Sequence, residues 1–399
     1  MAIVRALTEI SEQQNIQIKQ LWKPALARQI DIEALNEEPS ENICCRIGLL
    51  DDPEHQEQYA LSYDLEQCQH LLVVGESGSG KTTLLQSLLF SVACRYSQRQ
   101  VNYYVLDYSS RMLKKFDGLP HCGAVLLEED ADLLDAFFEQ INEIVAERKR
   151  KFSMWGVDSY TAAKHMETMP LILIVIDNIS GLSQTKQGDS HLYKLQNYMK
   201  DGLNYGIKYI VSCSHLNDLS TRIRQEFGDR ISLRMKDKYE YGEVLNCRVS
   251  YTPPEYPGRG LVVVEGRPLE IQTAMAGATL DQTERNQYMT EKLASVQEAY
   301  GDEDKAKRLK ITSETVTYDV FAGQFGKGRL PLGIAKKNQK TIALPLRQLS
   351  TLCIYQGAEE GTEAVLKNFL RAVKMNDGEL WFMQKREQSR FEACTREFP

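Results

Sequence analysis

Short, almost wholly apolar runs recur along the first half of the chain, and longer amphipathic stretches separate them. Apolar runs without polar alternation predict strands that are buried on both faces of a sheet. The apolar runs are 71–74, 102–107, 171–176 and 209–213, and the stretches that predict helices are one ending near residue 96, 130–152 and 194–203. Strands that alternate with helices indicate a parallel sheet with crossover helices. A ligand is then expected at the carboxyl ends of the strands.

The region before residue 71 has a different pattern. Apolar residues at roughly helical spacing within residues 1–30 predict a helix that docks on the core, and Pro24 ends it. Two further apolar segments, Ile43–Leu50 and Tyr59–Tyr63, flank a polar turn at Asp51-Asp52-Pro53. This pattern predicts a hairpin that precedes the first strand of the parallel sheet.

A glycine-rich sequence follows the apolar run 71–74. Its residues are Gly75, Glu76, Ser77, Gly78, Ser79, Gly80, Lys81, Thr82 and Thr83. Glycines at this spacing let backbone N–H groups turn toward a polyphosphate, while Lys81 reaches the β and γ phosphates and the Thr82 hydroxyl ligates Mg²⁺. The alternative is a chance turn, but a strand before the loop and a helix after it are the context that the motif requires. The sequence therefore predicts a nucleoside triphosphate site, with ATP and Mg²⁺ as cofactors.

An acid at the end of a buried strand is the second expected element of such a site. Asp177 follows the run 171–176 and is expected to hold the magnesium through water, unless it is only the polar end of a buried strand. The next residue is Asn178, where P-loop ATPases of the additional-strand type usually have Glu. An amide cannot accept a proton from water, so general-base help of about 10²-fold to 10⁴-fold is missing from this position. We expect tight ATP binding with slow or absent turnover; in the competing interpretation another carboxylate substitutes.

Length, charge and cysteine usage narrow the class of protein. The chain has 399 residues, of which 42% are apolar, enough for one large domain and a partial second. A net charge of −7 and a pI near 5.6 weaken any interpretation as a nucleic-acid binder. The nine cysteines include no CxxC pair, which suits a reducing cytosol. No apolar run approaches the length of a membrane span and the N-terminus has no signal-peptide pattern, so we expect a soluble chain.

A second copy of the first pattern is predicted near the C-terminus. Residues 331–372 repeat the element order of residues 47–93 without repeating the residues, and chance similarity is the alternative. In this copy the segment 357–364 stands where the phosphate loop stood, with Glu363 for the lysine and Ala364 for the hydroxyl. A carboxylate repels a triphosphate, so this copy should not bind ATP. One further strand is predicted at 379–384, which leaves the copy truncated or decayed.

These patterns divide the chain into three parts. We predict an ATPase module at 1–278, a helical and charged linker at 279–312, and a partial or degenerate second module at 313–399.

Several segments resemble a known family. They are Tyr209–His215, Arg230–Lys238, Pro257–Val262 and Gly266–Gln272, together with the phosphate loop and the Asp177 strand, and they resemble the FtsK/SpoIIIE superfamily. Within it, Pro257-Gly258-Arg259-Gly260 and the lead-in Trp22-Lys23-Pro24 look like the EssC/EccC coupling ATPases of type VII secretion. The resemblance covers about residues 1–275 well and 311–399 loosely. It implies a RecA-like P-loop NTPase of the additional-strand type, α/β, with a mostly parallel central sheet and flanking helices.

The resemblance also implies roles for single residues. Lys81, Thr82 and Asp177 match the nucleotide and magnesium positions, and Ser214 matches a sensor of the γ phosphate, although a serine at a strand end can simply be a cap. The family has an arginine where this chain has Gly242. An arginine acting in trans would then be Arg230, Arg222 or Arg224, each of which is equally consistent with a surface charge.

What the family does gives the expected setting. Such proteins carry tandem ATPase modules behind transmembrane segments and move small helical-hairpin proteins across the bacterial membrane. The resemblance implies a soluble module at the cytoplasmic face of that membrane. Its partners are then other modules of the same protein, an oligomeric ring and secreted substrates. It implies no nucleic acid, and contact with the membrane only through the parent protein.

Three function classes follow. The preferred one is a platform that binds ATP and helps to recognise substrates with little or no hydrolysis; the alternatives are a hydrolysing translocation motor and an FtsK-like DNA translocase. No basic strip or winged-helix tail accompanies the core, which disfavours the third class. Aromatic residues near 154–155 and 239–241 are candidates for a substrate groove, with core packing as the alternative.

Overall fold

A computed structural model describes residues 10, 23–36, 42–185, 187–301, 304–309, 328–334, 341–345, 369 and 371. The chain divides into two compact units, Met1–Glu129 with Asn142–Arg308, and Asp130–Ile141 with Leu309–Pro399. The first unit is built on a ten-stranded sheet of order β2-β1-β10-β9-β8-β3-β7-β6-β4-β5. The domain boundaries at 278 and 312 stay predictions.

One end of this sheet is parallel. Its strands are β8 (Asp229–Leu233), β3 (Leu71–Val74), β7 (Ile207–Cys213), β6 (Leu171–Asp177), β4 (Val101–Asp107) and β5 (Cys122–Leu127). Every residue of β3, β4, β6 and β7 is buried, because helices cover both faces. The predicted order of strands and helices is confirmed here. The strand β5 was not predicted from the sequence. In β5, Gly123 makes room for the Tyr104 ring, since a Cβ at Gly123 would lie 2.1 Å from that ring.

The other end is antiparallel. The strands β1 (Cys44–Asp52) and β2 (Glu57–Asp64) form the predicted hairpin, and β10 (Arg267–Thr273) joins β1 to β9 (Arg259–Val264). Because β9 pairs with β8, the hairpin and the parallel strands belong to one continuous sheet. Five of the nine strand pairings in this sheet are parallel. The prediction of a mostly parallel sheet with flanking helices is confirmed.

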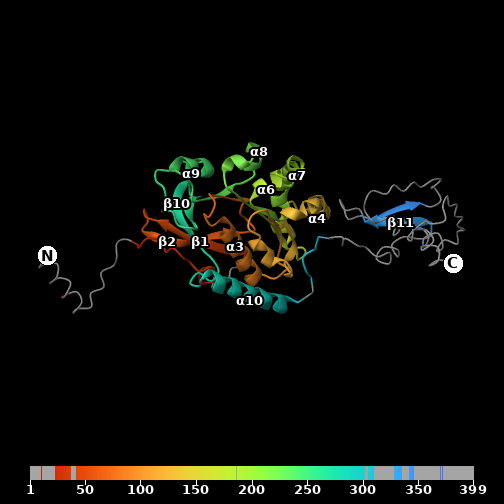
Figure 1. Ribbon diagram of the computed structural model, residues 1–399, viewed down its shortest axis with the longest axis horizontal. Helices are drawn as coiled ribbons and strands as arrows, with labels where there is room; N and C mark the ends of the chain where they lie inside the picture. Colours follow the sequence, from red (N-terminus) through yellow and green to blue (C-terminus); the bar gives the residue numbers. More distant parts are fainter. Residues whose placement is uncertain are drawn as a thin grey trace, which may run out of the picture. The chain divides into compact units, whose positions relative to one another are not determined.

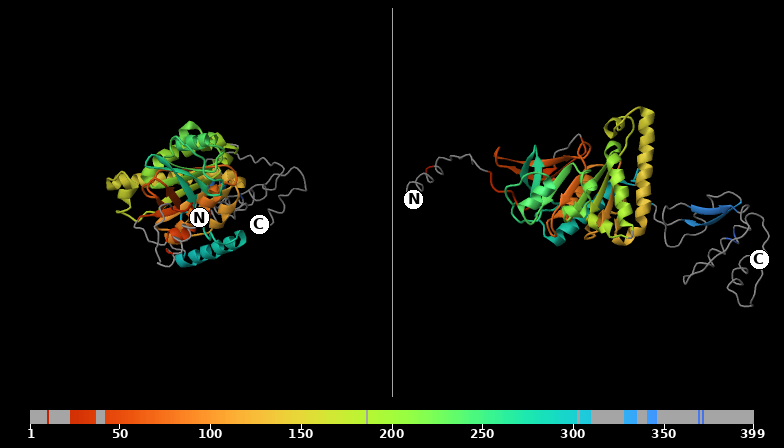
Figure 2. Two further views of the ribbon diagram at one scale, coloured as in Figure 1. Left: turned by 90° about the vertical axis from the view of Figure 1, so that its left-hand side faces the viewer. Right: turned by 90° about the horizontal axis from the view of Figure 1, so that it is seen from above.

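Helices cover the two faces of the sheet. In Figure 1, the helices α6 (Ile179–Ser183), α7 (Gly188–Gly202), α8 (Thr221–Arg224) and α9 (Lys238–Leu245) lie at the upper side. The helix α10 (Gln282–Tyr300) lies lowest and α3 (Lys81–Arg95) lies above it, level with β1. The left view of Figure 2 shows α10 at the same outer side of the molecule. The remaining elements are α2 (Ile32–Leu35), α4 (Leu134–Trp155), α5 (Tyr160–Ala163), η1 (Met112–Phe116), η2 (Glu128–Leu133), η3 (Leu203–Tyr205) and η4 (Leu216–Asp218). Two helices differ from expectation: α4 begins later and continues to Trp155, and α7 begins six residues before Lys194, at a polar Gly-Asp-Ser-His segment without apolar periodicity.

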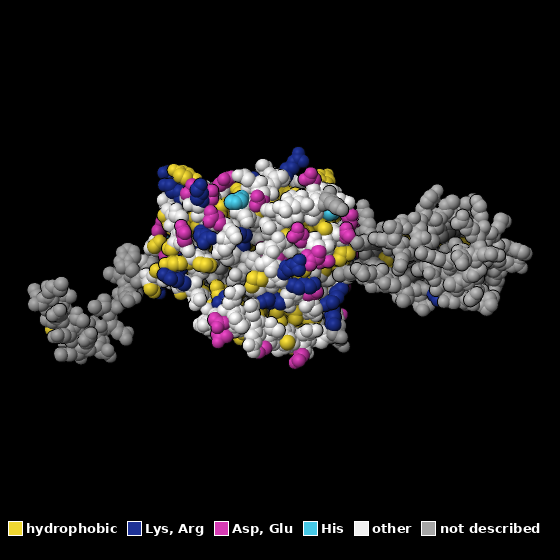
Figure 3. Space-filling view, viewed as in Figure 1, with side chains coloured by type: hydrophobic (Ala, Val, Ile, Leu, Met, Phe, Trp, Pro, Cys, Tyr) yellow, Lys and Arg dark blue, Asp and Glu magenta, His cyan; other side chains and the backbone are white. Residues whose placement is uncertain are grey.

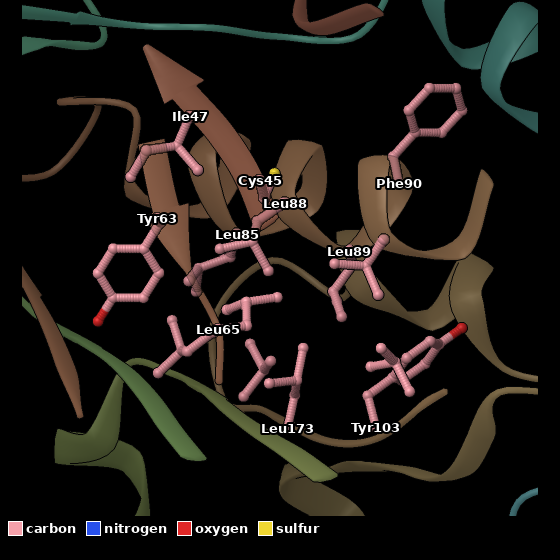
Figure 4. Close-up of a cluster of buried hydrophobic side chains, with 14 of the residues drawn as sticks. Cys45, Ile47, Tyr63, Leu65, Leu85, Leu88, Leu89, Phe90, Tyr103 and Leu173 are labelled. Carbon is pink, nitrogen blue, oxygen red and sulfur yellow. The ribbon is translucent and has the colours of Figure 1, made fainter. Parts of the chain in front are cut away.

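The core lies between α3 and the sheet. Figure 4 shows Leu85, Leu88 and Leu89 of α3 among side chains of the strands, including Leu173 and Tyr103. The three leucines are at most 1% exposed, and full burial of a leucine contributes about 1.5–3 kcal/mol. This packing fixes α3, and therefore its first residue Lys81, against the central strands.

The second unit contains an antiparallel pair, β11 (Arg329–Ile334) and β12 (Thr341–Pro345). The predicted loop at 357–364, the predicted strand at 379–384 and most of the predicted helix within residues 1–30 lie outside the described residues.

Candidate nucleotide site

The glycine-rich loop follows a central strand of the sheet. It connects β3 to α3, and β3 is paired on one side with β7 and on the other with β8. The backbone pairing extends past the end of β3, because the Gly75 N–H donates to the Cys213 carbonyl at 3.3 Å and the Glu76 N–H donates to the Arg234 carbonyl at 2.9 Å. The loop therefore starts from a rigid edge of the sheet.

Two glycines of the loop are needed for its shape. Gly78 has φ +73° and Gly80 has φ +105°, conformations that side chains rarely adopt. A Cβ at Gly80 would also lie 2.8 Å from the Gly258 nitrogen, whose N–H donates to the Ser79 carbonyl at 2.7 Å. The Pro-Gly-Arg-Gly segment thus packs directly on the loop. No side chain caps the start of α3 at Gly80, which leaves its first N–H groups for an anion.

Lys81 reaches back into the loop. Its ammonium donates to the carbonyls of Gly75 at 2.5 Å and Glu76 at 3.0 Å. Burial lowers the pKa of Lys81, and the negative charge of Asp177 opposes that change. The ammonium is therefore held at the centre of the loop, where a phosphate chain would meet it.

Asp177 is fully buried at the end of β6. Its carboxylate accepts the hydroxyls of Thr82 at 2.6 Å and Ser212 at 2.5 Å. Burial raises the pKa of Asp177, the two hydroxyls oppose the rise, and Asp107 adds to it. Within the described ranges, no three His, Cys, Asp or Glu side chains gather as a metal cluster. The pair of Thr82 and Asp177 nevertheless fits Mg²⁺, which is held by one or two carboxylates with water and substrate phosphates supplying the other ligands.

Asn178 adopts an unusual backbone conformation, with φ +66° and ψ +74°. Its N–H donates to the Ser212 hydroxyl at 2.8 Å, and its side-chain amide donates to the Tyr108 carbonyl at 3.3 Å. Asn tolerates the left-handed region better than most residues, because its short amide can bond locally. The local backbone at this position is thus suited to Asn.

A nearby carboxylate that replaces the missing Glu would have to be free to accept a proton. Asp107 ends β4 directly beside Asp177, but it is only 2% exposed. Its two oxygens accept the backbone N–H groups of Ser109 at 3.1 Å and Leu113 at 3.0 Å. These two bonds hold the Asp107 carboxylate against the loop that follows β4.

The other predicted residues lie in different surroundings. Ser214 follows β7 and is half-buried beside the edge of the sheet that carries the loop. The Arg230 guanidinium donates to the carbonyls of Phe227, Val244 and Arg224 at 2.9–3.3 Å, so its own chain holds it. A Cβ at Gly242 would lie 2.9 Å from the Cys247 carbonyl, which gives this glycine a packing reason.

Sequence reasoning missed three residues of the site. Ser212 bonds Asp177, Arg234 contacts the loop, and Gly258 packs on it. Ser212 was detectable as the single polar residue of the apolar run 209–213. Arg234 and Gly258 come from segments far from the loop in sequence, so only the pairing of β3, β8 and β9 brings them there.

The chain has the features of a P-loop NTPase. These are the order of its strands, a phosphate loop between β3 and α3, and an acid at the end of β6. The chain matches the FtsK/SpoIIIE family over residues 48–258, more than half of its length, and it belongs to that family.

Its relatives are type VII secretion proteins. The chain is 23% identical over 389 residues to the ESX secretion system protein EccC of Geobacillus thermodenitrificans, covering 94% of this chain and 26% of that protein. It is 22% identical over 383 residues to the type VII secretion system protein EssC of Staphylococcus aureus, covering 90% of this chain and 25% of that one. The chain thus spans about a quarter of these relatives.

Solved structures share the fold. EssC (ATPases 2 and 3) from Geobacillus thermodenitrificans matches with a TM-score of 0.77 and 21% identity, over 89% of this chain and 68% of that one. Thermomonospora curvata EccC (ATPases 2 and 3), in complex with a signal sequence peptide, matches with a TM-score of 0.73 and 22% identity, over 88% and 67%. The pCW3 conjugation coupling protein TcpA with ATPγS matches with a TM-score of 0.54, 16% identity and coverage of 68% and 75%. The family match, these sequence similarities and the shared fold agree with one another, because two of the solved structures are ATPase modules of such secretion proteins.

Among the residues that the structure describes, no helix combines the length and the apolar character that crossing a membrane requires. On the face shown in Figure 3, Lys and Arg side chains are interspersed with Asp and Glu side chains.

Proposed function

We propose that this module binds Mg·ATP and hydrolyses it slowly or not at all, as part of a larger type VII secretion ATPase. The loop from Gly75 to Thr83 would hold the phosphates, with Lys81 among them, and Thr82 and Asp177 would hold Mg²⁺. When bound, Mg²⁺ neutralises charge on the β and γ phosphates. The observation that carries the proposal is Asn178, an amide beside the metal-holding acid.

The surroundings of Asn178 support a role in binding rather than turnover. Its amide is bonded to the Tyr108 carbonyl, and the adjacent carboxylate Asp107 is committed to two backbone N–H groups. Arg230 is bonded within its own chain, and Gly242 occupies the position of the family's arginine. The site therefore offers strong phosphate contacts and weak support for cleavage. Ser214 and Arg230 stay proposals as sensor and trans arginine.

We place the module at the cytoplasmic face of a bacterial membrane, to which other parts of a longer protein would attach it. The relatives are about four times as long as this chain, which leaves room for tandem modules and anchors. Residues 313–399 would begin a second module, because the pair β11–β12 follows the linker as β1–β2 precedes β3. Helical-hairpin secretion proteins are the proposed substrates, and a ring of modules is the proposed assembly.

Equilibrium binding of a fluorescent ATP analogue, measured beside steady-state phosphate release, tests the proposal. We expect binding without release by the unmodified chain, and loss of binding in Lys81→Ala. Lys149→Ala is the matched control, since Lys149 is an exposed lysine paired with Asp201 at 2.6 Å. No binding by the unmodified chain would refute the proposal. Brisk release would favour the motor, and release stimulated by DNA would favour a DNA translocase.

A further inference from the structure

The phosphate loop carries its own negative charge. Glu76 is the second residue of the loop and its side chain is 39% exposed, so its carboxylate adds a negative charge to the loop that would hold a triphosphate. Like charges on one loop repel each other, and they do so more strongly in a site of intermediate dielectric than in water. A loop that binds ATP therefore needs a cation to offset Glu76.

Arg234 is placed to supply that cation. It comes directly after β8, and its carbonyl accepts the Glu76 N–H at 2.9 Å, which anchors it to the loop through the backbone. Its guanidinium donates to the Ser77 carbonyl at 2.7 Å and lies 3.6 Å from the Glu76 carboxylate. A Cβ on Gly78 would lie 3.8 Å from the same guanidinium.

The position of Arg234 differs from that of the other arginines considered for this site. Arg230 points its guanidinium at three carbonyls of the segments around α8 and α9, whereas the Arg234 guanidinium contacts Glu76 and Ser77 of the phosphate loop. Burial lowers the pKa of Lys81 most, and the positive charge of Arg234 lowers it further. Its charge is thus felt inside the loop.

We propose that Arg234 is a positioning residue that neutralises Glu76 in the same chain, so that the loop accepts a triphosphate without a cation from a neighbouring subunit. This inference depends on the proposed function, because it assumes that the loop binds ATP. The cation at this site then belongs to the same chain, so ATP binding does not require the trans arginine of the family.

A set of variants measured for ATP and ADP affinity tests the inference. We expect Arg234→Ala to weaken the affinity for ATP by about tenfold, which corresponds to about 1.4 kcal/mol. The affinity for ADP should fall by less, because ADP carries less charge. Arg234→Lys should keep most of the affinity. The double variant Glu76→Gln with Arg234→Ala should return to within about threefold of the unmodified chain, because the charge that needed neutralising is gone. Added salt should reduce the deficit of Arg234→Ala.

Controls separate this inference from the proposed function. Arg99→Ala breaks an exposed arginine–carboxylate pair, Arg99 with Asp304 at 2.6 Å, at the amino end of β4, and should leave ATP affinity unchanged. If the unmodified chain fails to bind ATP, the proposed function fails. If it binds and Arg234→Ala binds equally well, only this inference fails.

Two other results would also overturn it. Equal losses for ATP and ADP would mean that charge is not the cause. Failure of Glu76→Gln to restore binding would mean that Arg234 acts only by holding the Ser77 carbonyl. If thermal unfolding shows that Arg234→Ala does not fold, Glu76→Gln alone decides: tighter ATP binding supports the inference and weaker binding contradicts it.

Discussion

Replacing Asn178 with Glu would put a carboxylate directly after Asp177, where it could orient and deprotonate water. The replacement also imposes a longer side chain on a backbone with φ +66°. Asn178→Gln is the matched variant, because Gln has the same shape and the same backbone strain but cannot act as a base. The ratio of phosphate release between these two variants therefore isolates the carboxylate.

The structure sets the size of both effects. A left-handed conformation costs roughly 1–2 kcal/mol for residues other than Gly and Asn, and loss of the bond from the Asn178 amide to the Tyr108 carbonyl adds about 0.5–1.5 kcal/mol. We expect both variants to lose about 2 kcal/mol, a fall in Tm of roughly 4–8 °C. General-base help contributes about 10²-fold to 10⁴-fold, and we expect about 10²-fold because Gly242 leaves the family's arginine unsupplied.

The assay is steady-state phosphate release with saturating Mg·ATP, with Lys81→Ala as the blank and thermal unfolding of each variant recorded in parallel. We expect Asn178→Glu to exceed Asn178→Gln by the stated factor. Equal release by the two variants would refute the reasoning that the amide blocks hydrolysis. Asn178→Gly checks the strain separately, since it should lose less stability than Asn178→Gln.

Three more predictions concern the scaffold. Burial lowers the pKa of His70 to about 4, the charge of Lys208 adds to the lowering, and the contact of the ring with the Met199 carbonyl at 2.9 Å opposes it. The neutral ring is therefore favoured, and its Nδ1 accepts the Tyr209 N–H at 3.1 Å. The stability it contributes is complete above pH 6.5 and is lost as the pH falls toward 4, by about 3 kcal/mol; urea unfolding of the unmodified chain and His70→Gln across this range should show a shallower pH dependence in the variant. Gly80→Ala should lower the Tm of the protein more than Gly118→Ala does, and it should also abolish ATP binding. Both glycines have positive φ, but of the two only Gly80 has a neighbour within 4 Å of the added Cβ. Equal Tm values for the two variants would contradict this prediction. Arg259→Ala should lower the free energy of unfolding in urea by about 3–5 kcal/mol, because Arg259 is 3% exposed and pairs with Glu270. It should also weaken nucleotide binding through the neighbouring Gly258. A loss of stability below about 1 kcal/mol would contradict the buried pair.

The parallel half of the fold was predictable because its signals are local. Four apolar runs gave β3, β4, β6 and β7, and the glycine-rich loop located the start of α3 at Lys81. The antiparallel half was only partly predictable. The hairpin β1–β2 has a turn signal, but its attachment to the rest of the sheet depends on the pairing of β1 with β10, whose partners are far apart in sequence, such as Leu49 with Gln272.

The site shows the same division. The phosphate loop and Asp177 were found from sequence because each combines a residue pattern with a strand end, and their roles stay predictions. Ser212 and Arg234 were missed because their importance comes from the strands beside them. The aromatic segment 239–241 illustrates the limit of composition alone, since Tyr239 is 76% exposed whereas Tyr241 is 1% exposed.

The helix α10 has a consequence for how the module communicates along the chain. It packs on α3, with the Tyr288 ring 6.3 Å from that of Phe90 and with Met289, Leu293 and Val296 buried. The helix on which α10 packs is therefore the same helix that begins at Lys81 of the phosphate loop. The contact between these two helices couples the position of α10 to the position of the loop.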